Sequence, residues 1–438
     1  MENIIVWIDS SIKIEKKIIK LNKFLNKQFN KVLFVSKDKA TAIFYKTKGF
    51  KILSIEESLK NLDNLENLDY DKIFPDDLDP RILRNIINFF SFKNKCLPNY
   101  LIDDYPDALS ELSILENFWS NLLIENNISH GLVLNGISIS SFSLALCLYK
   151  INKNLVFWEN GLFPESLFIN KSGVNAFSYV DKIEMQNSNS INPTTLDQLI
   201  KYLVGKFKNK PSILVTLQVD TDTNIKCFSP FFSVNDFVQY LKIQFQDKFF
   251  ETINIVFRNH PKYKISKKFL KSNSFNNLKI SDNTFDFDLK NSDIVITINS
   301  TTGFEAILNR KCLISFGNSY YSKFLRFKYI RHENKKIKVF IFNPNDKVDI
   351  KIRKILISSL QGNSLTLNKN FNEWVNIFNN VSETEVKPFF VNDYFNQYIF
   401  RDKIISSLPK KYYNLEFFNN CLSKIKGLIN RLYKILFP

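Results

Sequence analysis

The sequence predicts an α/β protein made of two successive domains, each with strands and helices in alternation. The chain has 438 residues, more than one ordinary hydrophobic core accommodates. Short apolar runs rich in β-branched residues alternate with helical stretches in two separate series along it. A polar segment at residues 186–195, QNSNSINPTT, breaks the pattern between the series and is our candidate linker.

The first series forms the expected N-terminal domain, residues 1–195. We expect its strands at residues 3–8, 31–35, 51–55, 131–135 and 155–158. We expect its helices at residues 12–29, 108–126 and 140–150. Residues 61–105, rich in Asn, Asp and Pro, are expected to form loops around a short helix near residues 81–90. The chain is expected to turn at residues 159–161, directly after a strand.

The second series forms the expected C-terminal domain, residues 196–375, followed by C-terminal helices at residues 376–438. We expect strands at residues 213–217, 253–257, 278–280, 294–298, 312–316 and 338–342. We expect helices at residues 196–207, 234–246 and 304–309, a helix or loop at residues 285–290, and a loop at residues 218–228.

Composition argues against several classes of protein. Hydrophobic residues make up 45% of the chain, yet no apolar run is long enough to span a bilayer. The N-terminus has no basic segment before its short apolar run, so we expect a first strand rather than a signal peptide, and a cytoplasmic protein. The 5 cysteines are scattered without a CxxC pair and there are only 3 histidines, which argues against a structural zinc site or a disulfide framework.

The formal net charge of +17 indicates an anionic partner. No RNP-like, zinc-finger or helix-turn-helix pattern accompanies it, so we do not expect nucleic acid. An anionic membrane surface, an anionic sugar donor or an acidic glycan fits better. Residues 414–438 place Leu and Ile at a spacing of three to four with Lys and Arg among them. This tail is either a basic amphipathic helix on the inner face of the membrane or a helix packed on the body.

Polar clusters follow four of the expected strands. They are Glu159, Gln218 to Asp222, Arg258 to His260, and Asn299 to Thr302. Ligands of parallel α/β sheets bind beyond the carboxyl ends of strands, so four such clusters together indicate a binding cleft.

The turn at residues 299–303, NSTTG, joins a strand to a helix. A helix N-terminus there would offer free backbone N–H groups, with the hydroxyls of Ser300, Thr301 and Thr302 beside them, and would bind an anion. Glu305 is expected in the first turn of the helix, where it favours the dipole or accepts hydrogen bonds from ligand hydroxyls. The alternative is that Ser300 only caps the helix and Gly303 only relieves a tight turn.

The other clusters carry groups suited to catalysis. Asp220 and Asp222 are two residues apart and could hold a metal, or one could act as nucleophile or base. No further acid or His cluster completes a metal site, so we expect none. Arg258 suits bidentate contact with phosphate or carboxylate, and His260 suits donation to a phosphate oxygen. Glu159 is a general base for an acceptor hydroxyl or a capping residue.

Two such halves suggest two Rossmann-like domains facing a cleft, as in a GT-B-type glycosyltransferase. Together the motifs resemble the capsule polysaccharide biosynthesis family that contains the bacterial β-Kdo transferases. The similarity runs from about residue 130 to 325, whereas the first 130 residues match only in predicted architecture. The resembling motifs are WENGLFPESLFINKSGVNAFS (158–178), LQVDTDTNI (217–225), RNHP (258–261) and NSTTGFEAILNRKCLISFGNSYY (299–321).

The resemblance implies a GT-B-like fold and a CMP-activated 3-deoxy-octulosonic acid (Kdo) donor. It also implies retention of the β-configuration, with Asp222 rather than Asp220 on the acidic position of the family pattern. Asp222 would be the nucleophile, Glu159 the acid/base, and Arg258 and His260 would hold the CMP phosphate or the Kdo carboxylate. The implied nucleotide and substrate contacts are Ser300, Thr301, Thr302 and Glu305, with Gln218, Asn299 and Gly303 beside them.

The resemblance requires no cofactor, since the donor already carries its leaving group. One departure is that Leu162-Phe163-Pro164 follows Glu-Asn-Gly where the family often carries a basic residue, which leaves the acceptor open. We therefore expect a membrane-associated transferase for capsule or lipopolysaccharide that uses CMP-Kdo and a glycan or glycolipid acceptor. The alternatives are another CMP-ulosonate or a CDP-activated donor, or a non-catalytic glycan-binding assembly subunit.

Overall fold

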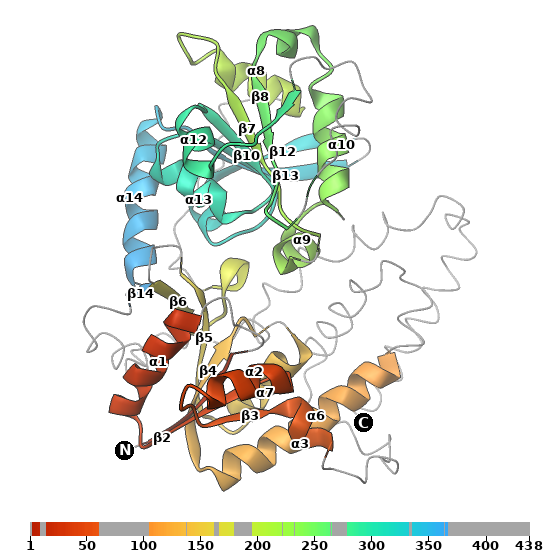
Figure 1. The fold of residues 1–438 in the computed structure, drawn as a ribbon. Coiled ribbons are helices and arrows are strands. Elements are labelled where there is room, and N and C mark those ends of the chain that lie inside the picture. The colour runs from red at the N-terminus through yellow and green to blue at the C-terminus, as the bar shows by residue number, and fades with distance from the viewer. Residues whose placement is uncertain are drawn as a thin grey trace, which may run out of the picture. The chain divides into compact units, whose positions relative to one another are not determined.

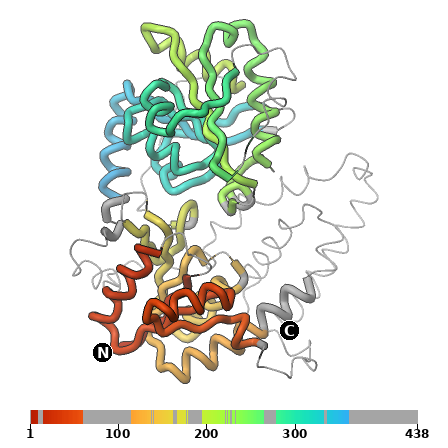
Figure 2. The backbone as a smooth tube through the Cα atoms, viewed as in Figure 1, coloured from red at the N-terminus to blue at the C-terminus, as the bar shows by residue number. Residues whose placement is uncertain are grey.

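The chain forms two compact units, each built on one seven-stranded sheet. Unit 1 comprises Met1–Tyr179 and Gly362–Pro438, and unit 2 comprises Val180–Gln361. The computed structural model (Figures 1 and 2) describes residues 2–8, 15–60, 105–136, 138–161, 166–178, 195–220, 222–231, 233–262, 264, 278–332, 335–362 and 364–366.

The sheet of unit 1 has the strand order β14-β6-β5-β4-β1-β2-β3. Its strands are β1 (Asn3–Trp7), β2 (Lys31–Ser36), β3 (Ile52–Ser54), β4 (Ile128–Leu134), β5 (Asn154–Asn160), β6 (Ser166–Asn170) and β14 (Ser364–Thr366). The pairs from β3 to β5 are parallel, and β6 and β14 add antiparallel strands at one edge. The order reverses between β1 and β4, as in a doubly wound sheet.

The helices of unit 1 bury apolar side chains against this sheet. They are α1 (Glu15–Gln28), α2 (Lys39–Lys46), α3 (Ile55–Lys60), α6 (Tyr105–Glu125), α7 (Ile139–Lys150) and the short η4 (Asn175–Phe177). In α1, Ile18, Leu21 and Leu25 follow helical spacing and are fully buried. Trp158 is also fully buried, and its indole N–H donates to the Trp7 carbonyl at 3.2 Å, which ties β5 to β1 across the core.

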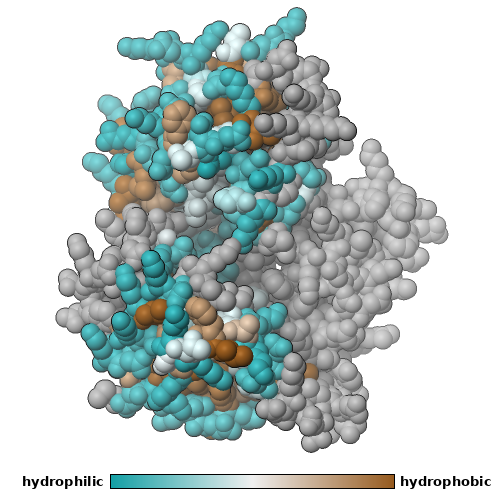
Figure 3. Space-filling model, in the orientation of Figure 1, coloured by the Kyte–Doolittle hydropathy of each residue, from teal (hydrophilic) through white to brown (hydrophobic). Residues whose placement is uncertain are grey.

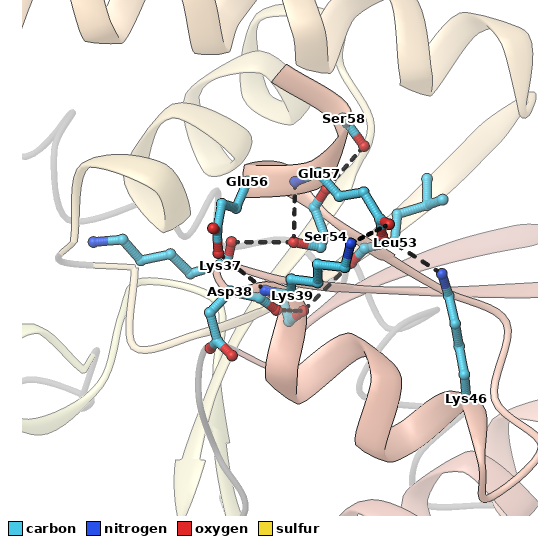
Figure 4. Close-up of polar contacts among 10 residues, drawn as sticks. Lys37, Asp38, Lys39, Lys46, Leu53, Ser54, Glu56, Glu57 and Ser58 are labelled. Atoms are coloured by element: carbon cyan, nitrogen blue, oxygen red, sulfur yellow. Dashed lines mark hydrogen bonds and ion pairs between the residues drawn. The ribbon is translucent and has the colours of Figure 1, made fainter. Parts of the chain in front are cut away.

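A network of polar contacts connects the segments that follow β2 and β3 (Figure 4). The Ser54 hydroxyl accepts from the Glu57 N–H at 3.3 Å, and Glu56 accepts from the Lys39 N–H at 3.2 Å. Asp38 caps α2 by accepting from the Thr41 N–H at 2.7 Å. These polar groups are already engaged in holding α2 and α3, so we assign them a structural role.

The sheet of unit 2 has the order β12-β13-β11-β10-β7-β8-β9. Its strands are β7 (Ile213–Thr216), β8 (Ile255–Arg258), β9 (Leu278–Ile280), β10 (Ile294–Thr297), β11 (Cys312–Ser315), β12 (Arg326–His332) and β13 (Lys335–Phe342). The pairs from β9 to β11 are parallel, and the β12–β13 hairpin adds antiparallel strands at the edge. The order again reverses at the first strand, between β7 and β10.

Helices lie on both sides of the second sheet, with α12 and α13 on one side and α10 on the other (Figure 1). The elements are α8 (Leu196–Val204), α9 (Thr223–Phe228), α10 (Val234–Gln244), η5 (Lys248–Thr252), α12 (Phe285–Lys290), α13 (Thr301–Leu308), η6 (Tyr321–Phe324) and α14 (Lys347–Gly362). Every residue of β7, β10 and β11 is buried, which explains why these strands are continuous apolar runs rather than alternating ones.

The predicted fold class, two Rossmann-like α/β halves, is confirmed by the two sheets. The domain borders differ from the predicted ones at residues 195 and 375, since unit 2 runs from Val180 to Gln361. The later difference arises because β14 pairs with β6 and so returns the chain to unit 1. The core of the predicted linker, the helix near residues 81–90 and the C-terminal helices lie outside the described residues.

Two local predictions are wrong. The loop predicted at residues 218–228 becomes α9 from Thr223, because the Asp222 carboxylate caps this helix. The turn predicted at residues 159–161 starts too early, because β5 continues through Glu159 to Asn160 to pair with β6. In the part of the chain that the structure describes, no helix is both long and apolar enough to cross a membrane. The described surface in Figure 3 is mostly hydrophilic, with small separate hydrophobic areas.

A buried ion pair anchors β12 to α14 and gives a stability prediction. Asp349 is fully buried and accepts from Arg326 at 2.9 and 2.6 Å and from the Asn343 N–H at 2.6 Å. Asp349→Ala leaves the guanidinium without this partner and should cost about 3–5 kcal/mol. Asp346, whose side chain is 31% exposed, also pairs with Arg326, and Asp346→Ala should cost at most about 1 kcal/mol. Urea unfolding followed by far-ultraviolet circular dichroism measures both, and equal losses would contradict the assignment.

Candidate functional site

The predicted polar residues of unit 2 gather where its strand order reverses. Gln218 follows β7, Asn299 and Ser300 follow β10, and Arg258 ends β8. β7 lies between β8 and β10 in the sheet, so three neighbouring strands present their carboxyl ends at one edge. This edge is the expected ligand position in an open α/β sheet.

Asn299 and Gln218 form a reciprocal buried pair. The Gln218 Nε2 donates to Asn299 Oδ1 at 3.0 Å, and the Asn299 backbone N–H donates to Gln218 Oε1 at 3.2 Å. The Asn299 Nδ2 also donates to the carbonyls of Asn224 at 2.8 Å and Asn318 at 3.2 Å. Both side chains therefore fix the loops that follow β7, β10 and β11. Their predicted contact with substrate stays a prediction.

The turn after β10 forms the N-terminus of α13. The Ser300 hydroxyl accepts from the Thr302 N–H at 3.3 Å and caps the helix, which begins at Thr301 rather than at the predicted Phe304. The Thr302 and Thr216 hydroxyls are 2.7 Å apart and join this turn to β7. Thr301 is exposed. The earlier start also moves Glu305 into the second turn, so the predicted first-turn placement is wrong.

Tyr321 packs directly under this turn. Its hydroxyl donates to the Ser300 carbonyl at 2.8 Å, and burial raises the pKa of this hydroxyl to about 12, so it remains a donor throughout the neutral range. A Cβ on Gly303 would lie 2.4 Å from the Tyr321 hydroxyl oxygen. Glycine is therefore required at residue 303 because the tyrosine occupies the space, and φ there is not in the left-handed region. The sequence motif contains Gly303 but gives no sign of Tyr321 as its partner.

Both acids of the Asp-x-Asp motif cap helices. Asp220 accepts from the Val234 N–H at 2.6 Å at the start of α10, and Asp222 accepts through Oδ1 from the Asn224 N–H at 2.9 Å at the start of α9. Among the described residues, no hydrogen bond reaches the second oxygen of Asp222. Asp222 is only partly buried, so this oxygen is the atom suited to attack a substrate.

Arg258 is held by a buried acid that sequence reasoning missed. Its Nη1 donates to Asp288 Oδ2 at 2.7 Å and to the Asn283 carbonyl at 2.7 Å. The guanidinium also lies 5.7 Å from the Phe285 ring centroid. Asp288 is 7% exposed and accepts a second bond from Ser281 at 2.7 Å. Both of these bonds use Nη1, so Nε and Nη2 are the atoms suited to a bound anion.

His260 follows β8, and its Nδ1 accepts from the Lys262 N–H at 3.1 Å. In the neutral ring this places the proton on Nε2. Glu159 belongs to unit 1, where its carboxylate accepts from Asn175 Nδ2 at 2.8 Å at the end of β5. The roles predicted for both residues stay predictions.

Among the described residues, no group of three His, Cys, Asp or Glu side chains is arranged to hold a metal ion.

One family model matches a segment of the chain that contains this site. Residues 168–324 match the model of a family described as capsule polysaccharide biosynthesis protein. The predicted resemblance is confirmed over that segment. It contains Asp222, Arg258, His260 and the α13 turn, whereas Glu159 precedes it.

Individual relatives are more distant. Protein FixF of Sinorhizobium fredii (strain NBRC 101917 / NGR234) is 25% identical over 267 residues, which are 56% of this chain and 59% of that protein. The chain thus spans less than two thirds of that relative. A β-Kdo 2,7 transferase, KpsC of Thermosulfurimonas dismutans, is 19% identical with a TM-score of 0.33, over 59% of this chain and 88% of that one. MurG of Acinetobacter baumannii is 8% identical with a TM-score of 0.32, over 71% and 77% of the two chains.

The contact between Gly303 and Tyr321 gives a paired prediction. Gly303→Ala forces the buried tyrosine to shift and should cost about 1–3 kcal/mol. Urea unfolding followed by far-ultraviolet circular dichroism measures this loss. Adding Tyr321→Phe removes the nearest atom, although the ring Cζ stays 2.7 Å from the new Cβ, so part of the stability should return. Additive losses in the double variant would contradict this packing.

Glu305 gives a prediction that depends on pH. Its pKa is raised, mainly by partial burial and secondly by the charge of Asp286. The ionised form is therefore disfavoured in the folded protein, and stability is lost as pH rises from the ordinary carboxyl pKa of the unfolded chain to the raised pKa of the folded protein. Glu305→Gln should raise the Tm at neutral pH, and the gain should vanish as acidification protonates Glu305. Thermal denaturation at several pH values measures this; a gain that persists in acid would contradict it.

Proposed function

We propose that the protein is a retaining glycosyltransferase that transfers Kdo from CMP-Kdo to a bacterial surface glycan or glycolipid in capsule or lipopolysaccharide biosynthesis. The observation that supports the proposal is that Asp222 follows β7, Arg258 ends β8 and the α13 turn follows β10, three strands that are neighbours in the sheet. All three lie in the segment that matches the capsule polysaccharide biosynthesis family.

The charges of this edge fit such a donor. CMP-Kdo carries a phosphodiester and a carboxylate, two anions close together. Arg258 offers a planar guanidinium oriented by Asp288, and the N-terminus of α13 offers the exposed Thr301, with its hydroxyl and its backbone N–H. A preorganised set of donors stabilises the charge that develops on the leaving phosphate, because it needs no rearrangement during the reaction.

The proposed chemistry is a double displacement. The free carboxylate oxygen of Asp222 attacks the anomeric carbon of Kdo, the bond from that carbon to the phosphate oxygen breaks, and CMP leaves with the electron pair. His260 donates from Nε2 to a phosphate oxygen of the departing CMP. An acceptor hydroxyl then gives its proton to Glu159 and attacks the same carbon, which releases Asp222. Two inversions at one carbon give retention.

We also propose that the protein works in the cytoplasm, at the inner face of the membrane. Two features of the sequence support this proposal. The net charge is +17, and residues 414–438 place apolar side chains at helical spacing with basic ones among them. Those residues lie outside the described part of the chain.

The two aspartates give the decisive test. Asp222→Asn keeps an oxygen that caps α9 but removes the nucleophile, so transfer should fall at least about a thousandfold while CMP binding persists. Asp220→Asn likewise keeps its cap at Val234 and should retain most activity. CMP release from CMP-Kdo and intact-mass spectrometry measure the result, and the Kdo-sized adduct on the wild type should be absent in Asp222→Asn.

Parallel reactions with CMP-sialate and a CDP-activated donor identify the donor. Glu159→Gln, which keeps an acceptor for Asn175, should form the adduct but release it slowly. A larger loss in Asp220→Asn than in Asp222→Asn would show that the other acid is the nucleophile. Folded wild-type protein that neither binds nor turns over any of these donors would overturn the proposed function.

A further inference from the structure

One face of the β12–β13 hairpin carries aromatic and cationic side chains together. The strands are antiparallel, with Phe327 opposite Phe340, Tyr329 opposite Lys338 and Arg331 opposite Lys336. Residues opposite each other share a face of the sheet, and alternate residues along a strand do so too. We use the name ribbon face for five of these side chains: Phe327, Tyr329, Arg331, Lys336 and Lys338.

The orientation of the ribbon is fixed by its other face. Ile330, Ile337 and Val339 are buried in the core of unit 2. The ion pair between Arg326 and Asp349 holds the start of β12 on α14. Because side chains alternate along each strand, the ribbon face must point away from this core.

The ribbon face is packed yet accessible. Tyr329 is 50% exposed, and Arg331 and Lys336 are exposed. The rings of Phe327 and Tyr329 meet edge to face at 5.8 Å. The Lys338 ammonium lies 4.0 Å from the Phe327 ring centroid and 5.0 Å from that of Phe340, a cation–π arrangement that holds both rings and the charge in place.

The charge of the ribbon has one sign. Neither β12 (RFKYIRH) nor β13 (KKIKVFIF) contains Asp or Glu, and the described acids that pair with Arg326 approach from α14 and the loop before it. Glu333, between the two strands, lies outside the described residues. Charges on an edge strand prevent pairing with another sheet, but an exposed tyrosine beside them does not serve that purpose. The presence of an exposed aromatic side chain among cationic ones therefore requires another explanation.

We propose that the ribbon face binds an acidic glycan, a chain of sugars that bear carboxylates or phosphates. The C–H face of a sugar ring packs on Tyr329, because the face of an aromatic ring is electron-rich and apolar. Arg331, Lys336 and Lys338 pair with the anionic groups. From Phe327 to Arg331 the face extends about 13 Å, enough for a short oligosaccharide.

This surface is separate from the donor site. β12 is three strand positions from β10 in the sheet, or about 14 Å. The choice of a glycan over another polyanion rests on the proposed function, in which a surface glycan is the acceptor. The ribbon face would then hold a part of that glycan remote from the reacting sugar, and so favour long acceptors over short ones.

The test measures binding without donor or turnover. Wild-type protein should be retained on polygalacturonate and not on neutral dextran. Tyr329→Ala, and separately Arg331→Glu with Lys336→Glu, should each weaken retention by about tenfold, equivalent to about 1.4 kcal/mol. Matched controls in the same unit should stay within about twofold of wild type. Tyr202→Ala removes a tyrosine that is 40% exposed with Lys206 at 4.8 Å from its ring, and Lys351→Glu with Lys354→Glu makes the same charge change on α14.

Oligothymidylate and phosphatidylglycerol vesicles are tested beside the glycan. Equal losses in the ribbon variants and their controls would overturn the proposal, as would an absence of glycan binding by wild type. If the wild-type protein binds the DNA or the vesicles but not the glycan, and Tyr329→Ala abolishes that binding, then that partner replaces the glycan in the proposal. Initial transfer rates with a short soluble acceptor should be unchanged in the ribbon variants. Specific glycan binding by a protein inactive with every donor would refute the proposed function and leave this inference standing.

Discussion

The side-chain amide of Asn299 is the interaction on which the geometry of the second unit most depends. It lies 3% exposed at the end of β10 and binds the Gln218 side chain, the Asn224 carbonyl and the Asn318 carbonyl. One residue thus connects the segments that follow β7, β10 and β11. A buried amide with every bond made is stabilising and specific, whereas the same amide with one partner removed costs the desolvation of the group left behind.

This constraint explains why the neighbouring groups can be small. Once Asn299 fixes the end of β10, the Ser300 cap and the contact of Thr302 with Thr216 set where α13 begins, and Tyr321 supports the turn from below. Hydroxyls and backbone N–H groups bind an anion well only when their positions are already determined. The entropic cost of ordering them during binding would otherwise offset the favourable binding free energy. The buried carboxylate of Asp288 orients the Arg258 guanidinium by the same principle.

The sequence was sufficient for the α/β class and for the parallel strands of the second unit, because fully buried parallel strands such as residues 294–297 are continuous apolar runs. Strand β12, in which charged residues interrupt the apolar ones, was not predicted. Strands β6 and β14 escaped prediction because β14 has three residues and pairs with a segment almost two hundred positions earlier, a contact with no local signature. The position of Asp222 in a motif was visible, but its capping bond was not. Asp288 was missed because its burial depends on Arg258, which lies thirty residues away.

The pairing of β14 with β6 has a consequence for how the chain is made. Unit 2 is an insertion between two parts of unit 1, since residues 180–361 separate β6 from β14. A ribosome therefore releases the whole second unit before the last strand of the first sheet exists. During that interval β6 is an open sheet edge, with backbone groups that another chain could pair with. Completion of the first sheet therefore waits on synthesis of the second unit.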